Sequence, residues 1–265
     1  MINLKDKKRI VIKLGTSTLA HKTGKLNIRR MTNLTRVLAD LRNAGHEIIL
    51  VSSGAVGLGV GKLNLKERPK DTPTKQAAAA VGQCELMHVY DEMFSKYSVT
   101  VAQILLTKTI ISTPDRVDNV RNAVDTLTAM GVVPIVNEND TVAIDELELE
   151  IGENDSLSAI VASIVGAEVL IILSDIDGLY SEDPHKNQNA EMISVVSQID
   201  DSIEHLAGGA GSNLGSGGMA TKITAAKIAT TAGVDMVIMN GRNPEDLYRL
   251  FDGEQIGTYF PAVKS

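Results

Sequence analysis

Apolar and polar positions along the chain follow two alternating patterns. Short apolar runs without regular polar alternation are typical of strands buried on both faces of a sheet. We predict such strands at Arg9–Leu14, Glu47–Val51, Val99–Leu106, Val132–Val136, Val169–Leu173 and Val234–Met239, with an edge strand at Gly257–Phe260. The segments between them place apolar residues at helical spacing. We predict helices at Ile28–Asn43, Thr74–Lys96, Val120–Met130, Asp155–Val165, Gln198–Leu206, Met219–Ala232 and Pro244–Phe251.

This alternation of strands and helices predicts an α/β fold. Strands joined through helices lie mostly parallel, with helices covering both faces of the sheet. We therefore expect a three-layer αβα sandwich around a mostly parallel central sheet of about eight strands. Residues 141–151 alternate imperfectly between apolar and polar and favour a short hairpin. No linker or shift in composition divides the chain, so we expect a single domain over residues 1–265.

Composition and charge narrow the class of protein. The 265 residues are 43% hydrophobic and 22% charged, as in an ordinary globular protein. Acidic residues outnumber basic ones by 33 to 26, which argues against nucleic acid as a partner. No apolar run reaches the ~18 residues of a membrane span, and the N-terminus lacks the long apolar core of a secretory signal. We expect a cytoplasmic protein that binds neither nucleic acid nor a membrane.

Cysteine and histidine usage adds two expectations. Cys84 is the only cysteine, so no intramolecular disulfide can form, which also favours the cytoplasm. Its neighbours Leu86 and Met87 predict a buried or half-buried, inert thiol. The histidines are scattered without the spacing of metal ligands, so we predict no metal site made by the protein.

Small polar residues follow the predicted strands. Lys13 and Gly15, Ser52–Gly54, Asn137–Asp140 and Ser174–Asp175 each come at the end of an apolar run. Because ligands of open α/β sheets bind beyond the carboxyl ends of the strands, we expect these residues to meet at one rim.

Two Asn/Asp clusters and one lysine are the strongest candidates for chemistry. The clusters, Asn137–Asp140 and Gly152–Asp155, could each be an ordinary turn or helix cap, because Asn and Asp favour both. Lys13 lies in a strand that should be buried, where an unpaired lysine is costly. We therefore expect it to contact a ligand phosphate or a carboxylate such as Asp155 or Asp175.

Glycine-rich segments suggest phosphate binding, although no standard nucleotide fingerprint is present. Residues 52–59 follow a predicted strand, and we expect them to form a glycine-rich turn. Gly57–Lys62 has too few residues between its glycines for a P-loop. Gly15 and the run Gly215–Lys222 suit close approach of backbone N–H groups to a phosphate, and the run opens onto a helix N-terminus. Lys222 in that first turn favours a bound anion, although a surface loop with a solvated lysine is the alternative. We expect Gly208–Gly218 to be mobile.

Several motifs together resemble the amino acid kinase family, over essentially the full chain. They include VIKLGTSTL, VSSGAVGLG, TPTKQAAAAVGQ, VPIVNENDTVA, IGENDSLSAIVA, LSDIDGLYSEDP and GSGGMATKITAAKIA. The NEND and GEND pair, with SSGA and TKQA, resembles the branch that acts on glutamate. The resemblance implies transfer of a phosphoryl group from Mg²⁺-bound ATP to the side-chain carboxylate of L-glutamate, the first step of proline biosynthesis, with feedback inhibition by proline. It also implies a homodimer or homotetramer.

The resemblance assigns roles to individual residues. Lys13 and Lys222 would hold the phosphates during transfer, and Asp155 would orient both lysines. Glutamate would be bound by Ser53, Asp140 and Asn154. ATP would be bound by Lys13, Gly15, Ser174, Asp175, Ser216, Gly217, Gly218, Met219, Ala220, Thr221 and Lys222. Ser174 stands where the family often has threonine, and the sequence ends at Ser265 without the PUA domain that many members carry.

Two alternative functions remain open. A related kinase acting on N-acetylglutamate would keep the lysines and change the acceptor pocket, but Asp140 suits the free α-ammonium that N-acetylglutamate lacks. A non-catalytic amino-acid-binding regulator would have no need for Lys13, Lys222 and Asp155 together. With Asp140 and Asn154 binding glutamate, the hairpin expected at residues 141–151 between them would form a lid over the substrate.

Overall fold

The computed structural model describes residues 4–21, 25–142, 154–182, 184, 187, 189–207 and 218–263. These residues contain one seven-stranded sheet with the strand order β3-β4-β2-β1-β5-β6-β7. All neighbouring strands pair in parallel except β6 and β7, which pair antiparallel. The strands are β1 (Arg9–Leu14), β2 (Glu47–Ser52), β3 (Val101–Leu106), β4 (Val133–Glu138), β5 (Val169–Ser174), β6 (Asp235–Asn240) and β7 (Thr258–Phe260).

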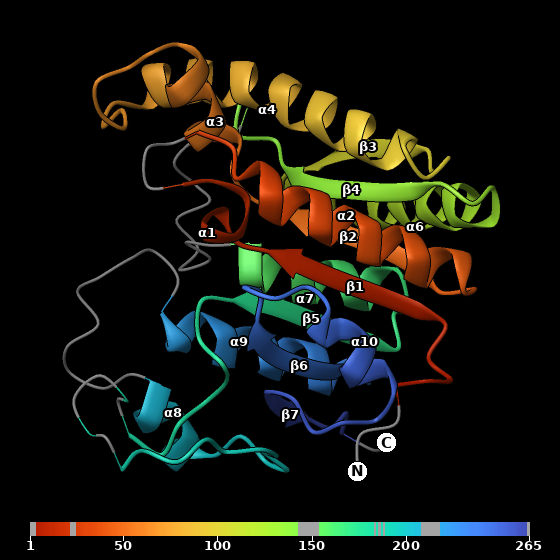
Figure 1. The fold of residues 1–265 in the computed structure, drawn as a ribbon, viewed down its shortest axis with the longest axis vertical. Helices are drawn as coiled ribbons and strands as arrows, with labels where there is room; N and C mark the ends of the chain where they lie inside the picture. Colours follow the sequence, from red (N-terminus) through yellow and green to blue (C-terminus); the bar gives the residue numbers. More distant parts are fainter. Residues whose placement is uncertain are drawn as a thin grey trace.

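Helices cover both faces of this sheet (Figure 1). The helices of the described residues are α1 (Thr16–Leu19), α2 (Ile28–Asn43), α3 (Ala55–Lys62), α4 (Thr72–Ser95), α5 (Lys108–Ile111), α6 (Pro114–Ala129), α7 (Asn154–Ile164), α8 (Asp201–Ala207), α9 (Met219–Thr231) and α10 (Asp246–Phe251). One apolar core joins α2, α4 and α10 to the sheet, and a second joins α6, α7 and α9 to the opposite face. The αβα sandwich predicted from the sequence is confirmed, with seven strands in the described residues against the expected eight or so.

The register of β1 decides which way Lys13 points. Successive side chains of a strand face opposite sides of the sheet. Ile10, Ile12 and Leu14 lie in the core beneath α2 and α4, whereas Val11 lies in the core beneath α7 and α9. Lys13 shares the parity of Val11, so its side chain extends toward α7 and α9.

Helices α3 and α4 touch through glycine. A Cβ atom on Gly59 would lie 1.8 Å from the carbonyl oxygen of Ala78, and one on Gly82 would lie 1.7 Å from that of Ala55. Only glycine permits backbones to approach this closely. The contact at Gly82 holds α4 against the first turn of α3, at the carboxyl end of β2.

Two sequence predictions for this region are wrong. Residues 52–59 were expected to form a glycine-rich turn after β2, but α3 begins at Ala55, immediately after a left-handed Gly54 with φ of 106°. Packing against α4 offsets the low helix propensity of the α3 glycines. Cys84 was expected to be buried or half-buried, but it lies on the exposed side of α4, because the helix buries Leu86 and Tyr90 instead.

Other expectations lie mainly outside the described residues. The hairpin expected at 141–151 is described only at Thr141 and Val142, which form a turn after β4. The loop expected at Gly208–Gly218 is described only at Gly218. The single-domain interpretation stays a prediction.

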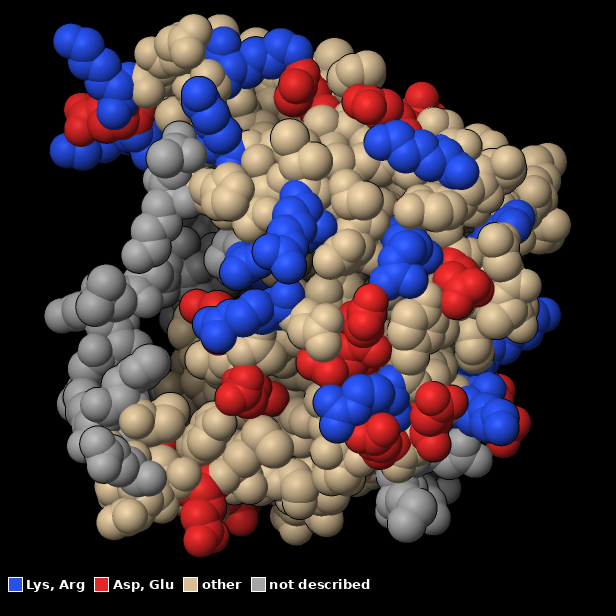
Figure 2. Space-filling view, in the orientation of Figure 1, with Lys and Arg blue, Asp and Glu red and all other residues tan. Residues whose placement is uncertain are grey.

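Charged residues are mixed across the surface. Figure 2 shows Lys and Arg interspersed with Asp and Glu over the displayed face rather than collected into one basic patch. Within the described ranges, no helix is both long enough and apolar enough to cross a membrane.

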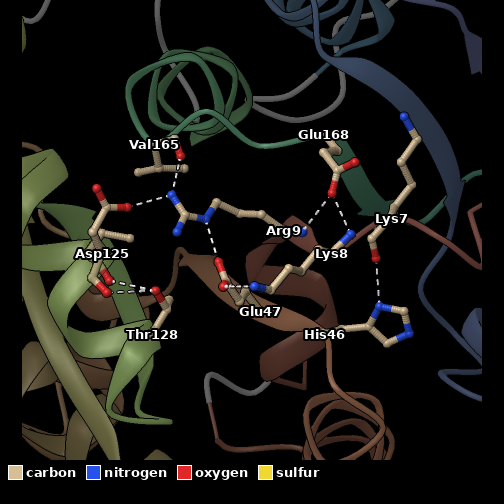
Figure 3. A network of polar contacts seen from close by, with 10 residues as sticks. Lys7, Lys8, Arg9, His46, Glu47, Asp125, Thr128, Val165 and Glu168 are labelled. Carbon is tan, nitrogen blue, oxygen red and sulfur yellow. Dashed lines mark hydrogen bonds and ion pairs between the residues drawn. The ribbon is translucent and has the colours of Figure 1, made fainter.

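A network around Arg9 ties the amino ends of three strands together (Figure 3). The Arg9 guanidinium donates to Glu47 at 2.7 Å, to Asp125 at 2.6 Å and to the carbonyl oxygen of Val165 at 2.7 Å. The backbone N–H of Arg9 also donates to Glu168, just before β5, at 3.2 Å. Since β1 and β2 begin at Arg9 and Glu47, the network joins the sheet to the ends of α6 and α7 at the rim opposite the polar strand ends.

We expect Arg9→Ala to lower the free energy of unfolding by about 2 kcal/mol, because several charge-assisted hydrogen bonds are lost from partly buried partners. Arg36→Ala is the control, since Arg36 pairs with Glu245 between two exposed side chains and should change stability by less than about 0.5 kcal/mol. Urea unfolding of both variants measures the difference. Equal stability of the two variants would contradict the structural role of the network.

Candidate active site

The polar strand ends meet at the carboxyl edge of the sheet, as the topology requires. β1, which carries Lys13, lies between β2 and β5 at the centre of the sheet. Lys13 aligns with Val51 of β2 and Ile172 of β5. Helices α7 and α9 begin at this edge, so their first turns face the end of β1.

Two lysines converge on one buried carboxylate. Lys13 Nζ lies 2.6 Å from Asp155 Oδ1, and Lys222 Nζ lies 3.2 Å from Asp155 Oδ2. The side chains of both lysines are 5% exposed, and that of Asp155 is fully buried. Thr221 Oγ1 donates to Asp155 Oδ2 at 2.9 Å. Strand β1 and helices α7 and α9 therefore bring these groups together from distant parts of the chain.

The protonation of Asp155 follows from this environment. Burial, the largest single influence, would raise the pKa of the carboxyl, but the charges of Lys13 and Lys222 and hydrogen bonds from Lys13 and Thr221 together outweigh it. The pKa of Asp155 is therefore held below its usual value. The carboxylate stays ionised at neutral pH and can position two ammonium groups.

The positions of Asp155 and Lys222 in the first turns of two helices explain why their opposite charges pair. Asp155 lies in the first turn of α7, where the helix dipole favours a negative charge. Lys222 lies in the first turn of α9, where the dipole disfavours a positive charge. The N-cap of α9, Gly218, offers no side chain to the first N–H groups. Asp155 thus compensates Lys222, and the start of α9 keeps backbone donors for an anion.

A chain of amide side chains crosses the same edge. Asn154 Nδ2 donates to the carbonyl oxygen of Ser52 at 3.1 Å and to Asn137 Oδ1 at 2.9 Å. Asn137 Nδ2 in turn donates to Gln83 Oε1 at 2.8 Å. The chain runs from the start of α7, past the end of β4, to α4 in the opposite helical layer. Sequence reasoning missed Gln83, whose only signal was its place in the TKQAAAAVGQ motif.

Two carboxyl groups lie at the end of β4, Glu138 as its last residue and Asp140 just after it. Burial, and secondly the charge of Asp140, raise the pKa of Glu138 to about 7. Burial also raises the pKa of Asp140, while the charges of Lys75 and Arg68 oppose that shift. Asp140 is therefore a half-buried acid just after β4, with cationic groups from the α3–α4 connection and α4 close enough to influence its pKa.

The remaining candidates lie at the ends of β1, β2 and β5. Ser53 follows β2, and its backbone N–H donates to the carbonyl oxygen of Leu14 at 3.2 Å. Gly15 follows β1 and begins the turn into α1, accepting from the N–H of Thr18 at 3.0 Å. Ser174 ends β5 and its hydroxyl donates to Asp175 Oδ1 at 3.2 Å.

The glycine-rich run is only partly described. Gly218, Met219, Ala220, Thr221 and Lys222 form the N-cap and first turn of α9, whereas Ser216 and Gly217 lie outside the described residues. In the part of the chain that the structure describes, no group of three His, Cys, Asp or Glu side chains is placed to hold a metal ion.

The family match and the similar proteins of known name agree with one another. Residues 8–240 match the model of the amino acid kinase family. The glutamate 5-kinase of Clostridium perfringens (strain 13 / Type A) is 53% identical over 263 residues, which cover 98% of this chain and 98% of that protein. The glutamate 5-kinase of Listeria monocytogenes serotype 4b (strain CLIP80459) is 50% identical over 264 residues, covering 99% and 96%.

Solved structures with low sequence identity share the fold. The UMP kinase from Bacillus anthracis is 16% identical, with a TM-score of 0.63 over 97% of both chains. An isopentenyl phosphate kinase is also 16% identical, with a TM-score of 0.65 over 95% of this chain and 99% of that chain. At such identity these two structures support the fold alone.

Glu138 provides a pH-dependent test of the site's burial. An acid whose pKa is higher in the folded protein stabilises the fold at low pH, and this stabilisation is lost as the pH rises from about 4.5 through about 7. We expect Glu138→Gln to raise the stability at pH 8 by about 1 kcal/mol, allowing for partial exposure, and to change it little at pH 5. Thermal unfolding at both pH values measures this, with Glu92→Gln on the exposed side of α4 as control. A Glu138→Gln effect independent of pH would contradict the assignment.

Proposed function

The chain belongs to the amino acid kinase family, and we propose that it has the activity for which its relatives are named, that of a glutamate 5-kinase. It transfers the γ-phosphoryl group of ATP to the side-chain carboxylate of L-glutamate, giving ADP and L-glutamyl 5-phosphate. This is the first step of proline biosynthesis. The observation that carries the proposal is the pair of buried lysines held by Asp155, in a chain that matches glutamate 5-kinases over almost its whole length.

The arrangement suits phosphoryl transfer to a carboxylate. Such an acceptor is already ionised at neutral pH, so it needs no general base. Transfer needs in-line placement of the two substrates and positive charge over the phosphoryl oxygens. Lys13 and Lys222 supply that charge, and Asp155 holds each of them through one of its two oxygens. The Mg²⁺ ion that accompanies ATP neutralises phosphate charge.

ATP and glutamate take different parts of the rim in this proposal. Ser174, Asp175, Gly15 and the first turn of α9 bind ATP, together with Ser216 and Gly217. Backbone N–H groups at the start of α9 and its lysine fit phosphate oxygens. Ser53, Asp140 and Asn154 bind glutamate, with Asp140 contacting the α-ammonium group.

The acceptor distinguishes this function from that of a related N-acetylglutamate kinase. An acylated nitrogen carries no charge to pair with Asp140, and burying that carboxylate against it would be unfavourable. The two lysines and Asp155 likewise separate an enzyme from a binding regulator, because binding an amino acid alone does not require phosphoryl-transfer groups.

Three further properties belong to the same proposal. Proline inhibits the enzyme by binding at or near the glutamate site. The protein acts in the cytoplasm, in keeping with its single cysteine. It assembles as a homodimer or homotetramer, for which light scattering gives the mass.

A substrate panel tests the activity. We expect ADP formation that depends on both L-glutamate and Mg²⁺, and an acyl phosphate that hydroxylamine traps as a hydroxamate. N-acetylglutamate, carbamate and UMP are the comparison acceptors, and each should support far slower turnover. Proline in the same assay should raise the glutamate concentration needed for half-maximal rate. Turnover with a comparison acceptor and none with glutamate would contradict the proposal, and unaltered glutamate kinetics in saturating proline would contradict the inhibition.

A further inference from the structure

Gln83 has an amide nitrogen that the interior of the protein leaves unsatisfied. Its Oε1 accepts the hydrogen bond from Asn137, but its Nε2 is buried and has no hydrogen-bond partner among the described residues. A buried donor without a partner costs about 1–3 kcal/mol. Gln83 follows Gly82, whose close contact with Ala55 holds it beside the first turn of α3. A ligand oxygen placed beside Gln83 would supply the missing acceptor.

The direction of the amide chain is fixed by a backbone carbonyl. The oxygen of Ser52 can only accept, so the group of Asn154 that lies 3.1 Å from it must be its NH₂ group. The second hydrogen of that NH₂ group goes to Asn137 Oδ1, which turns the NH₂ group of Asn137 toward Gln83. Gln83 must then present Oε1 to Asn137. Its own NH₂ group is left as a donor, and Asn154 Oδ1 is left as an acceptor.

The two ends of the chain therefore favour opposite charges. The donor end belongs to Gln83, which follows the Gly82–Ala55 contact at the start of α3, and the N-cap of α3, Gly54, makes no side-chain capping hydrogen bond. Donors gathered at one place favour an oxyanion. The acceptor end, Asn154 Oδ1, favours a positively charged donor, as Asp140 does. An α-amino acid carries one group of each kind.

We propose that Gln83 Nε2 donates a hydrogen bond to the α-carboxylate of the amino acid substrate, making Gln83 a further substrate-binding residue. The inference rests on the proposed function and identifies which part of the substrate this residue contacts. Asn154 adjoins Asp155 and its two lysines, whereas Gln83 is two hydrogen bonds further along the chain, in the opposite helical layer. The carboxylate that Gln83 contacts is therefore the one remote from the phosphoryl group.

A contact with a non-reacting group has a distinct kinetic signature. It contributes equally to the ground state and the transition state, so its loss raises KM and leaves kcat unchanged. We expect Gln83→Leu to raise KM for L-glutamate about tenfold, within the range expected for losing a hydrogen bond to a charged group. We expect kcat and KM for MgATP to stay within about twofold of wild type.

Gln83→Glu separates binding from positioning. It keeps an acceptor for Asn137 but replaces the donor with an oxygen that repels a carboxylate, so KM for glutamate should rise at least as far as in Gln83→Leu. Gln198→Leu and Gln198→Glu, at an exposed position, are the matched controls and should match wild type. Thermal unfolding of every variant reports whether it is folded. If Gln83→Leu does not fold, the KM of Gln83→Glu for glutamate tests the proposal.

The outcomes distinguish the two proposals. An unchanged KM for glutamate in Gln83→Leu, or a wild-type KM in Gln83→Glu, would overturn the role of Gln83 while leaving the glutamate kinase intact. An equal loss of kcat would also overturn it, because that result belongs to a residue acting on the reacting groups. A folded wild-type protein without glutamate-dependent turnover would instead contradict the proposed function.

Discussion

The fold depends on placing one ionised carboxylate, Asp155, in a fully buried position between two lysines. Burying a charge is unfavourable unless it is closely paired and hydrogen-bonded. Here the pairing comes from Lys13 on the central strand and Lys222 on α9, with Thr221 as a further donor. The central position of β1 and the starts of α7 and α9 are therefore constrained together. The buried carboxylate is the basis of the site, because it holds two ammonium groups in fixed positions at the rim.

A second constraint acts through neutral groups. The carbonyl oxygen of Ser52 sets the direction of three consecutive amides, and these join the two helical layers across the end of the sheet. The glycine contact between α3 and α4 brings Gln83 to the end of that chain. Charged groups thus lie in the half of the rim that we assign to phosphoryl transfer, and directed amides lie in the half that we assign to the amino acid.

The sequence predicted the layers and the central candidates because the signals were local. Buried strands and amphipathic helices follow from apolar spacing, and a lysine within VIKLG required a buried partner. The helix α3 was missed because glycine usually opposes helices, and only its contact with α4 makes glycine necessary there. Cys84 was misplaced because the apolar stripe of α4 includes its neighbours but leaves Cys84 itself outside. The role that we propose for Gln83 depends on hydrogen bonds to residues far away in sequence, which no local pattern reveals.

The most direct test compares kcat for three lysine variants in the glutamate-dependent assay. Lys13→Ala and Lys222→Ala should each lower kcat by about 100-fold or more, because each removes a charge that stabilises the transferring phosphoryl group. Lys227→Ala, on the same helix but paired with Glu204 at an exposed position, should retain the wild-type kcat. Wild-type turnover by a folded Lys13→Ala or Lys222→Ala protein would contradict the assignment of this buried cluster to catalysis.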